Sequence, residues 1–373
     1  MPHRLAASLL AIAVACCAIA LRPAGARLDE ADAIHTAPGS RAPATPASQT
    51  NSGFQADPSI AGMMSQVQAA RLYSLTAELT GEWPAIVGGE PYTISTRFTN
   101  SITPIQKATQ YAYEWMAGAG IAVDYHPWSA SGYSNRNVVA VITGAVRPDE
   151  IVMVVAHLDS LSPTQTRMTL APGADDNASG SAAALSMARI FSQYSFSRTL
   201  RLALFTGEEQ GLLGSSVYAA EARARNDTIV AVVNMDMIAW NSPGTPPTLD
   251  VHIRPETSAG YTDDLTLAGV FTNVVAAYGL SDQLIPEIQS NGMGASDHAS
   301  FWQQGYPAML LIEDYSLPDR DFNPHYHTVS DTLQHLDMDY FTAFVKAALG
   351  AAAHLAHPIA PAYVVFLPLA QHP

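Results

Sequence analysis

The sequence predicts an α/β protein, a three-layer sandwich with a central mixed, mostly parallel sheet covered by helices on both faces. The first observation behind this prediction is size, because a chain of 373 residues that is 48% hydrophobic can bury a large core. The second is pattern, because apolar runs of strand length alternate with amphipathic stretches of helical length from about residue 137 to residue 356. Such alternation is typical of a parallel sheet between two layers of helices.

The first 26 residues have the composition of a secretory signal. A basic residue, Arg4, precedes an apolar run over residues 5–21, and we expect cleavage after Ala24-Gly25-Ala26, with cleavage after Ala20 as an alternative. A retained membrane anchor is less favoured, because the run is short and Arg22-Pro23 ends it. We therefore expect a secreted, extracellular protein that is not stably inserted in a membrane.

Cysteine usage and charge exclude several classes of function. Both cysteines, Cys16 and Cys17, lie in the expected signal, so the mature chain should contain no disulfide, no Cys nucleophile and no Cys zinc ligand. Removal of residues 1–26 takes away Arg4 and Arg22 and leaves 16 basic and 33 acidic residues, a formal charge of −17. A protein this acidic should not bind nucleic acid electrostatically. We expect a monomer.

The expected domain lies between two segments of different composition. Residues 27–59 are rich in Ala, Pro, Thr and Ser, which is typical of a disordered linker or a pro-segment. The domain itself is expected over residues 60–357. The tail, residues 358–373, carries one apolar run at 363–367, which is interpreted either as an added edge strand or as a sorting remnant.

Within the domain, periodicity predicts the elements in order. A first helix is expected from about Ile60 to before Trp83-Pro84, because apolar residues recur at roughly helical spacing there. The other predicted helices cover residues 104–117, 178–193, 214–224, 263–279, 296–303 and 339–356. The predicted strands cover residues 137–143, 151–156, 200–206, 229–234, 249–253 and 308–312.

Histidine and acidic residues follow several of these strands. His157 follows the run 151–156, Glu208 and Glu209 follow 200–206, and Asp236 follows 229–234. In a parallel sheet the carboxyl ends of the strands meet at one edge, where ligands bind. Several carboxylates at one edge repel one another unless a cation compensates them. Imidazoles and carboxylates without thiolates suit Zn²⁺, with Mn²⁺ or Co²⁺ as possible substitutes.

Five motifs in series carry a family resemblance. They are Val155-Ala156-His157-Leu158-Asp159-Ser160, Pro172-Gly173-Ala174-Asp175-Asp176-Asn177-Ala178-Ser179-Gly180, Gly207-Glu208-Glu209-Gln210-Gly211-Leu212-Leu213-Gly214-Ser215, Asn234-Met235-Asp236-Met237 and His325-Tyr326-His327-Thr328. In this order they resemble the motifs of the M28 family of co-catalytic zinc aminopeptidases, most closely its secreted bacterial leucyl aminopeptidase branch. The segment Ser296-Asp297-His298-Ala299-Ser300-Phe301 also matches that branch. The resemblance spans roughly residues 60–357.

The resemblance implies a centre with two Zn²⁺ ions, with Asp175 as the ligand that bridges them. Asp176 is interpreted as a helix cap, a position that Asp favours. One ion would also be bound by His157 and Asp236. The other would be bound by Glu209 and by His327, which fits the motif better than its neighbours His298, His325 and His335. The implied metal ligands are His157, Asp175, Glu209, Asp236 and His327.

The same resemblance implies the catalytic roles. Glu208 would be the general base that takes a proton from the attacking water, and the two cations would polarise the scissile carbonyl. Asp159 would hydrogen-bond the far nitrogen of His157 and fix its tautomer. The peptide bond between Asp175 and Asp176 is expected to be cis.

The expected substrate pocket departs from the better-known members of that branch. They have a disulfide and a tyrosine before the Ser-Asp-His segment, whereas this chain has the Gly-rich residues 291–295. Met237, Met293 and Tyr326 are the candidate substrate-binding residues, and they favour an apolar first residue. His298 is expected to orient its own loop, and Glu313 and Asp314 are interpreted as structural.

The sequence therefore predicts a secreted zinc aminopeptidase that acts on the N-termini of peptides or proteins. Two alternatives remain. One is a carboxypeptidase or a glutaminyl cyclase on the same fold, and the cyclases bind one zinc ion and lack part of the ligand set. The other is a catalytically silent binding module, which would be expected to lose the general base or a ligand position.

Overall fold

The computed structural model of the chain describes residues 54–316 and 320–359. The predicted signal, residues 27–53 of the predicted linker or pro-segment, and residues 360–373 of the tail lie outside the described residues. The regular elements of the described part run from Pro58 to Ala356.

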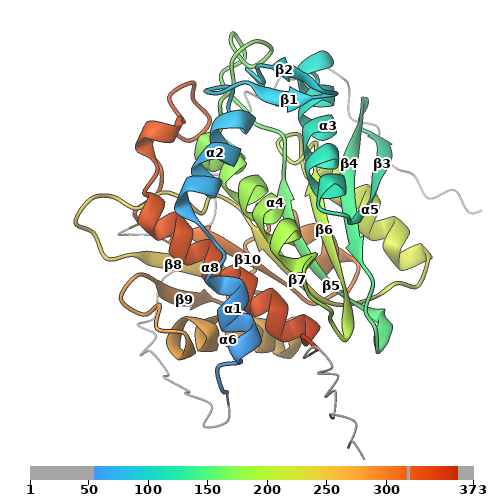
Figure 1. The fold of residues 1–373 in the computed structure, drawn as a ribbon, viewed down its shortest axis with the longest axis vertical. Helices are drawn as coiled ribbons and strands as arrows, with labels where there is room; N and C mark the ends of the chain where they lie inside the picture. The colour runs from blue at the N-terminus through green and yellow to red at the C-terminus, as the bar shows by residue number, and fades with distance from the viewer. Residues whose placement is uncertain (1–53, 317–319, 360–373) are drawn as a thin grey trace, which may run out of the picture. The chain divides into compact units, whose positions relative to one another are not determined.

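An eight-stranded sheet forms the centre of the fold, with strand order β3-β4-β6-β5-β7-β10-β8-β9 (Figure 1). Four pairings are parallel, namely β5 with β6, β5 with β7, β7 with β10 and β8 with β9, and three are antiparallel. The predicted mixed, mostly parallel sheet is therefore confirmed. Its strands are β3 (Ala122–Ala130), β4 (Tyr133–Ile142), β5 (Arg147–His157), β6 (Arg198–Phe205), β7 (Thr228–Met235), β8 (Thr248–His252), β9 (Ile285–Gln289) and β10 (Ala308–Glu313). A separate hairpin joins β1 (Ala85–Val87) and β2 (Glu90–Tyr92).

Helices cover both faces of this sheet, as predicted. Figure 1 views it from the side of α2, α3, α4 and α8. Buried side chains of α5 and α7 pack on the opposite face, in a second core. The helices are α1 (Pro58–Met64), α2 (Ala69–Leu79), α3 (Thr103–Gly118), α4 (Gly180–Phe191), α5 (Leu213–Ala224), α6 (Tyr261–Ala277), α7 (His298–Gln303) and α8 (Met338–Ala356).

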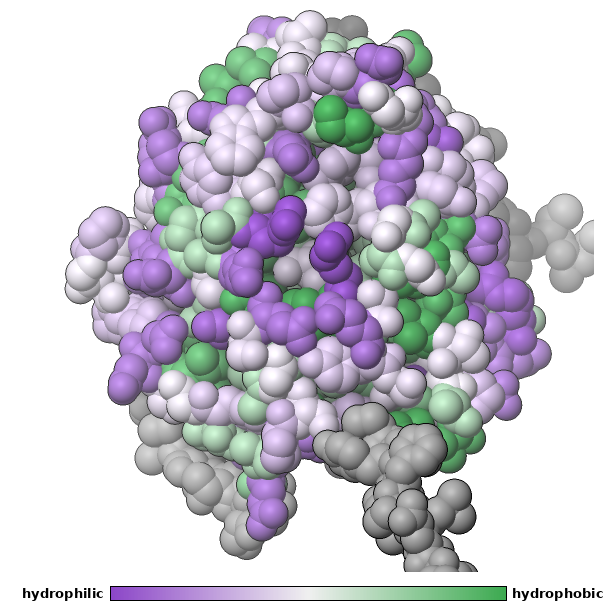
Figure 2. Space-filling view, viewed as in Figure 1, coloured by the Kyte–Doolittle hydropathy of each residue, from purple (hydrophilic) through white to green (hydrophobic). Residues whose placement is uncertain are grey.

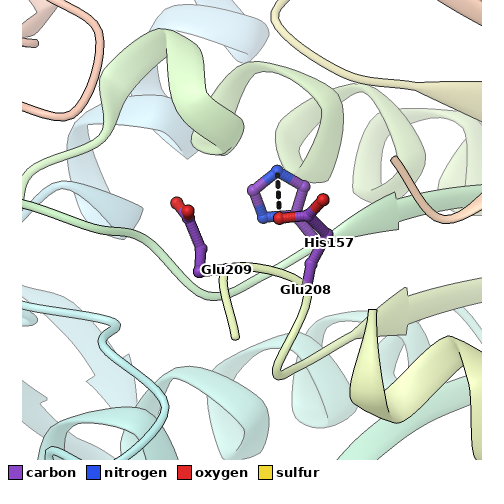
Figure 3. A group of neighbouring side chains, drawn as sticks. All are labelled: His157, Glu208 and Glu209. Atoms are coloured by element: carbon purple, nitrogen blue, oxygen red, sulfur yellow. Dashed lines mark ion pairs between the residues drawn. The ribbon is translucent and has the colours of Figure 1, made fainter. Parts of the chain in front are cut away.

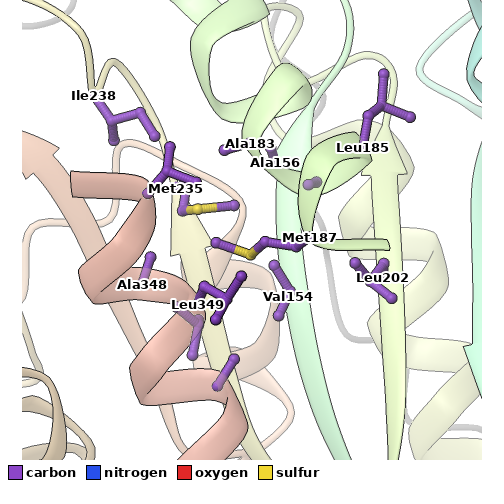
Figure 4. Close-up of a cluster of buried hydrophobic side chains, with 14 of the residues drawn as sticks. Val154, Ala156, Ala183, Leu185, Met187, Leu202, Met235, Ile238, Ala348 and Leu349 are labelled. Atoms are coloured by element: carbon purple, nitrogen blue, oxygen red, sulfur yellow. The ribbon is translucent and has the colours of Figure 1, made fainter. Parts of the chain in front are cut away.

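The main core lies between the sheet and the helices α4 and α8. Alternate residues of β5 such as Val154 point into it, while their neighbours such as Met153 and Val155 point into the second core. Figure 4 shows Met187 of α4 and Leu349 of α8 meeting side chains of the strands. Because both faces of the central strands are buried, these strands are apolar throughout, which is why the sequence revealed them.

The differences from the predicted elements lie at the edges of the sheet and at the first helix. The strands that the prediction missed in this sheet, β3 and β9, are its two edge strands, and they contain Pro127 and Pro286. Proline is tolerated there because an edge strand has an unpaired side, but it hides the strand in the sequence. The first predicted helix is two helices, α1 and α2, separated at residues 65–68.

The surface in the view of Figure 1 carries hydrophilic and hydrophobic residues interspersed (Figure 2). Across the described ranges 54–316 and 320–359, each helix is too short or too polar to cross a bilayer.

Candidate metal centre

The carboxyl ends of the central strands bring four of the predicted ligands together. His157 is the last residue of β5, Asp236 follows β7, and Glu209 lies in the loop after β6. His327 reaches the same place from the segment between β10 and α8. This is the edge of the sheet at which the sequence predicted a site.

Asp176 lies at the middle of this group. Its Oδ1 is 3.2 Å from Nε2 of His157, and its Oδ2 is 3.2 Å from Nε2 of His327. His157 Nε2 also lies 3.1 Å from Asp236 Oδ1, and His327 Nε2 lies 2.9 Å from Glu209 Oε2. The two oxygens of one carboxylate thus face two separate pairs of side chains, each made of one imidazole and one acid.

The assignment of the central acid to Asp175 is wrong by one residue. The Asp175 carboxylate turns away from the centre, where its Oδ1 accepts from the backbone N–H of Ala239 at 2.9 Å and its Oδ2 accepts from the amide of Asn323 at 3.1 Å. These bonds give Asp175 a structural role, and Asp176 occupies the central position that was predicted for Asp175.

The helix start shifts with the same residue. Asp176 was expected to cap the helix, but the side chain that accepts from the first N–H of α4, that of Gly180, is Asn177 through its Oδ1 at 2.8 Å. The non-proline cis peptide bond lies between Asp176 and Asn177, one residue later than predicted.

Glu208 and Glu209 occupy adjacent positions in the loop after β6 but face different partners. Figure 3 shows the Glu208 carboxylate over the imidazole of His157, with the Glu209 carboxylate apart from it. Glu208 Oε2 is 4.0 Å from His157 Nε2, which is beyond hydrogen-bond distance. Glu209 is paired with His327. The two neighbouring carboxylates therefore meet different imidazoles, and only Glu209 is within hydrogen-bond distance of its own.

Asp159 contacts His157 in a different way from the prediction. The Nδ1 of His157 donates to the backbone carbonyl of Asp159 at 3.1 Å, whereas the carboxylate is 3.8 Å away. A proton on Nδ1 leaves the lone pair of Nε2 free to bind a cation placed between it and the carboxylates of Asp176 and Asp236. The Asp159 carboxylate instead accepts from the backbone N–H groups of Glu208 and Glu209 at 3.3 and 3.4 Å. It therefore holds the loop rather than the imidazole.

The electrostatics of the centre are those of buried, crowded carboxylates. Burial raises the pKa of Glu209 to about 7, and the charge of Asp176 adds to the effect. Burial also raises the pKa of Glu208 well above its usual range, with the charge of Glu209 contributing. Burial opposes ionisation of Asp176 as well, but hydrogen bonds with His157 and His327 lower its pKa. A cation at this place would stabilise the ionised carboxylates.

The side chains present fit divalent cations. His157, Asp176 and Asp236 offer ligand atoms within 4.8 Å of one another, as do Asp176, Glu209 and His327, and His157, Glu208 and Glu209 form a third such group. Glu209 Oε1 is buried and has no hydrogen-bond partner among the described residues, as expected of an atom that awaits a ligand. Imidazole nitrogens with carboxylate oxygens are a donor set typical of zinc.

An apolar cluster lies beside His327. Its members are Met237, Leu310 and Ile312, which are buried, and Met293, Tyr315, Phe322 and Tyr326, which are partly buried. The structure thus brings the three candidate substrate-binding residues, Met237, Met293 and Tyr326, into one cluster. The ring of Tyr326 stacks on that of His327 with centroids 3.7 Å apart, which places the cluster directly against the centre. His298 lies behind it and bonds to the Met293 carbonyl through Nε2 at 2.8 Å, so it orients its loop as expected.

The sequence analysis did not identify the groups that bind the backbone of the two pairs of adjacent acids, Asp175–Asp176 and Glu208–Glu209. Asp331 accepts from the N–H groups of Asp175 and Asp176 at 3.0 to 3.2 Å, as Asp159 does for the other pair. Arg97 is fully buried nearby. The signal for Asp331 was its position four residues after His327, but Arg97 stands in a stretch without any motif.

Comparison with known sequences gives one family and several relatives. The model of peptidase family M28 matches residues 137–352. A probable leucine aminopeptidase 1 of Trichophyton verrucosum is 31% identical over 261 residues, which are 68% of this chain and 65% of the relative. Leucine aminopeptidase 1 of Trichophyton equinum is 32% identical over 231 residues, 60% of this chain and 59% of the relative. The chain thus spans about two thirds or less of the length of these relatives.

Comparison with solved structures supports the fold. LapA of Legionella pneumophila superposes with a TM-score of 0.64 at 22% identity, over 81% of this chain and 77% of that one. The aminopeptidase from Aneurinibacillus sp. strain AM-1 has a TM-score of 0.60 at 18% identity, over 80% of this chain and 97% of that one. A glutaminyl cyclase of Porphyromonas gingivalis also has 0.60, at 19% identity, over 77% and 98%. At these identities the likeness concerns the fold alone.

Proposed function

Because the chain belongs to peptidase family M28, we propose that it is a secreted aminopeptidase that binds two zinc ions and releases apolar residues from the N-termini of peptides. The observation that carries the proposal is the position of Asp176. Its two oxygens face two groups of His and acid ligands, which is the arrangement required of a carboxylate that bridges two cations. The names of the curated relatives, leucine aminopeptidases, support the same reaction.

Each proposed ion has three protein ligands. His157, Asp236 and Oδ1 of Asp176 would hold one, and His327, Glu209 and Oδ2 of Asp176 would hold the other. Two such cations would polarise the scissile carbonyl and make a water molecule between them more acidic. Asp175 is excluded from the ligand set by its bonds to Ala239 and Asn323.

Glu208 is the proposed general base. Its carboxylate lies beside His157 but makes no hydrogen bond to the imidazole of His157 or of His327. Burial raises its pKa, so that it can hold a proton taken from water and pass it to the leaving amine. The Asp159 carboxylate orients this segment through its bonds to the N–H groups of Glu208 and Glu209.

The apolar cluster beside His327 is the proposed site for the side chain of the first substrate residue. Met237 is buried and Met293 and Tyr326 are partly buried, so an apolar side chain that binds against them would move its surface out of water into an apolar environment. The ring of Tyr326 fixes the distance from this pocket to the centre, because it stacks on His327. Leu, Met or Phe at the first position should therefore be preferred over Lys or Glu.

The test is hydrolysis of aminoacyl-p-nitroanilides by the purified protein together with measurement of its zinc content. We expect activity on Leu-p-nitroanilide, loss of activity after exhaustive chelation, recovery with Zn²⁺, and two zinc ions per chain. Full activity after chelation, or the absence of aminopeptidase activity with two zinc ions bound, would overturn the proposal. Expression with residues 1–26 in a bacterial host and assay of the medium tests secretion.

The glutaminyl cyclase alternative has the same fold and needs its own assay. Both ligand groups are assembled here, which favours the two-ion reaction over the one-ion reaction expected of a cyclase. Incubation with a peptide that begins with glutamine separates the two. Loss of ammonia with retention of the first residue would identify cyclase activity, whereas release of free glutamine would identify the aminopeptidase.

A further inference from the structure

The geometry points to Thr99 as a positioning residue for the loop that carries Glu208 and Glu209. Its hydroxyl donates to Asp159 Oδ2 at 2.8 Å and accepts from the backbone N–H of Gly207 at 3.0 Å. Thr99 is 2% exposed, so water cannot replace these bonds. Within the described residues it makes no hydrogen bond to a proposed metal ligand, so it acts through Asp159 and the loop.

Thr99 and Asp159 together bind three consecutive backbone N–H groups. Thr99 accepts from Gly207, and the two carboxylate oxygens of Asp159 accept from Glu208 and Glu209. The hydrogen bonds that Asp159 accepts from the loop are long, at 3.3 and 3.4 Å. The orientation of its carboxylate therefore depends on the shorter bond from the Thr99 hydroxyl. The hydroxyl therefore sets both the start of the loop and the carboxylate that holds the rest of it.

Arg97 holds the segment that presents Thr99. Its buried guanidinium donates to the carbonyl groups of Leu158, Pro172 and Gly173 at 2.7 to 2.8 Å, and to that of Leu79 at 2.8 Å. Leu158 precedes Asp159, and Gly173 lies three residues before Asp176. The segment is thus tied to the chain on both sides of the centre, which gives the Thr99 hydroxyl a fixed position.

Residues 97–99 lie outside the part of the chain that the family model matches, which begins at residue 137. The inference rests on the proposed function for its kinetic test, since the loop carries the proposed base and one proposed ligand. It concerns the position of the loop, so it can also be tested without any metal ion.

The test compares Thr99→Val, which keeps the shape and removes the hydroxyl, with Thr99→Ser, which keeps the hydroxyl. Thr199→Val is the matched control, because the Thr199 hydroxyl also accepts from a glycine N–H, at 3.0 Å, and donates to a carbonyl, at 2.7 Å, but at the opposite end of β6. We expect kcat on Leu-p-nitroanilide to fall about 10- to 100-fold in Thr99→Val with KM nearly unchanged. Thr99→Ser should stay close to the wild type, and so should Thr199→Val.

A second readout is amide hydrogen exchange of the metal-free proteins. Thr99→Val should speed exchange in the peptide that covers residues 207–213, whereas Thr199→Val should not. If Thr99→Val does not fold, Thr99→Ala takes its place in both measurements. Wild-type kcat in Thr99→Val, failure of Thr99→Ser to restore kcat, or an equal loss in Thr199→Val would overturn the inference. An inactive wild type with faster exchange in Thr99→Val would instead contradict the proposed function alone.

Discussion

The two pairs of adjacent acids, Asp175–Asp176 and Glu208–Glu209, are built alike and used differently. In each pair a buried carboxylate accepts both backbone N–H groups, Asp331 for the first pair and Asp159 for the second. Both side chains of the second pair face the centre. In the first pair only Asp176 does so.

The difference comes from partners that are distant in sequence. Asp175 turns away because the N–H of Ala239, 64 residues later, and the amide of Asn323, 148 residues later, bind its two oxygens. Within the described residues, the carboxylates of Glu208 and Glu209 accept no hydrogen bond from a group outside the centre. Which of two neighbouring acids enters a site is thus decided by the groups around them and not by the pair itself.

Replacement of Asp176 should have the largest effect on activity. Asp176→Asn keeps the size of the side chain but removes the charge shared by the two ligand groups. We expect activity on Leu-p-nitroanilide to fall to that of the chelated wild type and the zinc content to drop below two ions per chain. Activity assays with zinc quantification check both.

Asp175→Asn is the matched control for this prediction. It should retain zinc and most of the activity, but its free energy of unfolding should fall by about 1–3 kcal/mol, because the new amide meets the amide of Asn323 and leaves buried donors unpaired. Denaturant unfolding measures this loss. If Asp175→Asn loses zinc while Asp176→Asn keeps both ions, Asp175 and not Asp176 is the acid that bridges the two ions.

Part of the fold and of the site could be predicted from the sequence. The apolar runs of β5, β6, β7 and β10 predicted the sheet, and their ends correctly placed His157, Glu209, Asp236 and the loop of Glu208. The sequence could not choose between Asp175 and Asp176, because the choice is made by Ala239 and Asn323 through tertiary contacts. Nor could it reveal Thr99, since a single buried hydroxyl leaves no periodic pattern.

The proposed roles of Glu208 and Glu209 can be separated by the same kind of substitution. Glu208→Gln should reduce kcat by about 10²- to 10⁴-fold, because it removes the proposed base, and should leave the zinc content at the wild-type value. Glu209→Gln should instead weaken zinc binding, since it removes a carboxylate paired with His327. Zinc titration of both variants against kcat separates these roles. A Glu208→Gln protein that loses zinc would mean that base and ligand have been exchanged.

Replacement of Asp331 or Asp159, whose carboxylates bind the backbone of the two acid pairs, should have smaller effects that resemble each other. Asp331→Asn replaces one acceptor oxygen by a donor, so the N–H groups of Asp175 and Asp176, which now share two acceptor oxygens, are left with one. Zinc affinity should fall by about 10- to 100-fold. Asp159→Asn should weaken the hold on Glu208 and Glu209 in the same way, and competition with a chelator measures both. Unchanged affinity in both variants would show that the loops keep their positions without these bonds.

The smallest effect concerns the helices that follow the two pairs. At the start of α4 the side chain of Asn177 accepts from the N–H of Gly180, whereas α5 begins after Leu212, which has a positive φ of 60° and no side-chain hydrogen bond to the helix. Such a φ costs a non-glycine residue about 1–2 kcal/mol, and glycine in its place costs about 0.5–1 kcal/mol in chain entropy. These terms nearly cancel, so Leu212→Gly should change the free energy of unfolding by less than about 1 kcal/mol. Asn177→Gly, in contrast, also removes the bond to the Met235 carbonyl and should cost more. Equal losses in the two variants would mean that the two helix starts are stabilised alike.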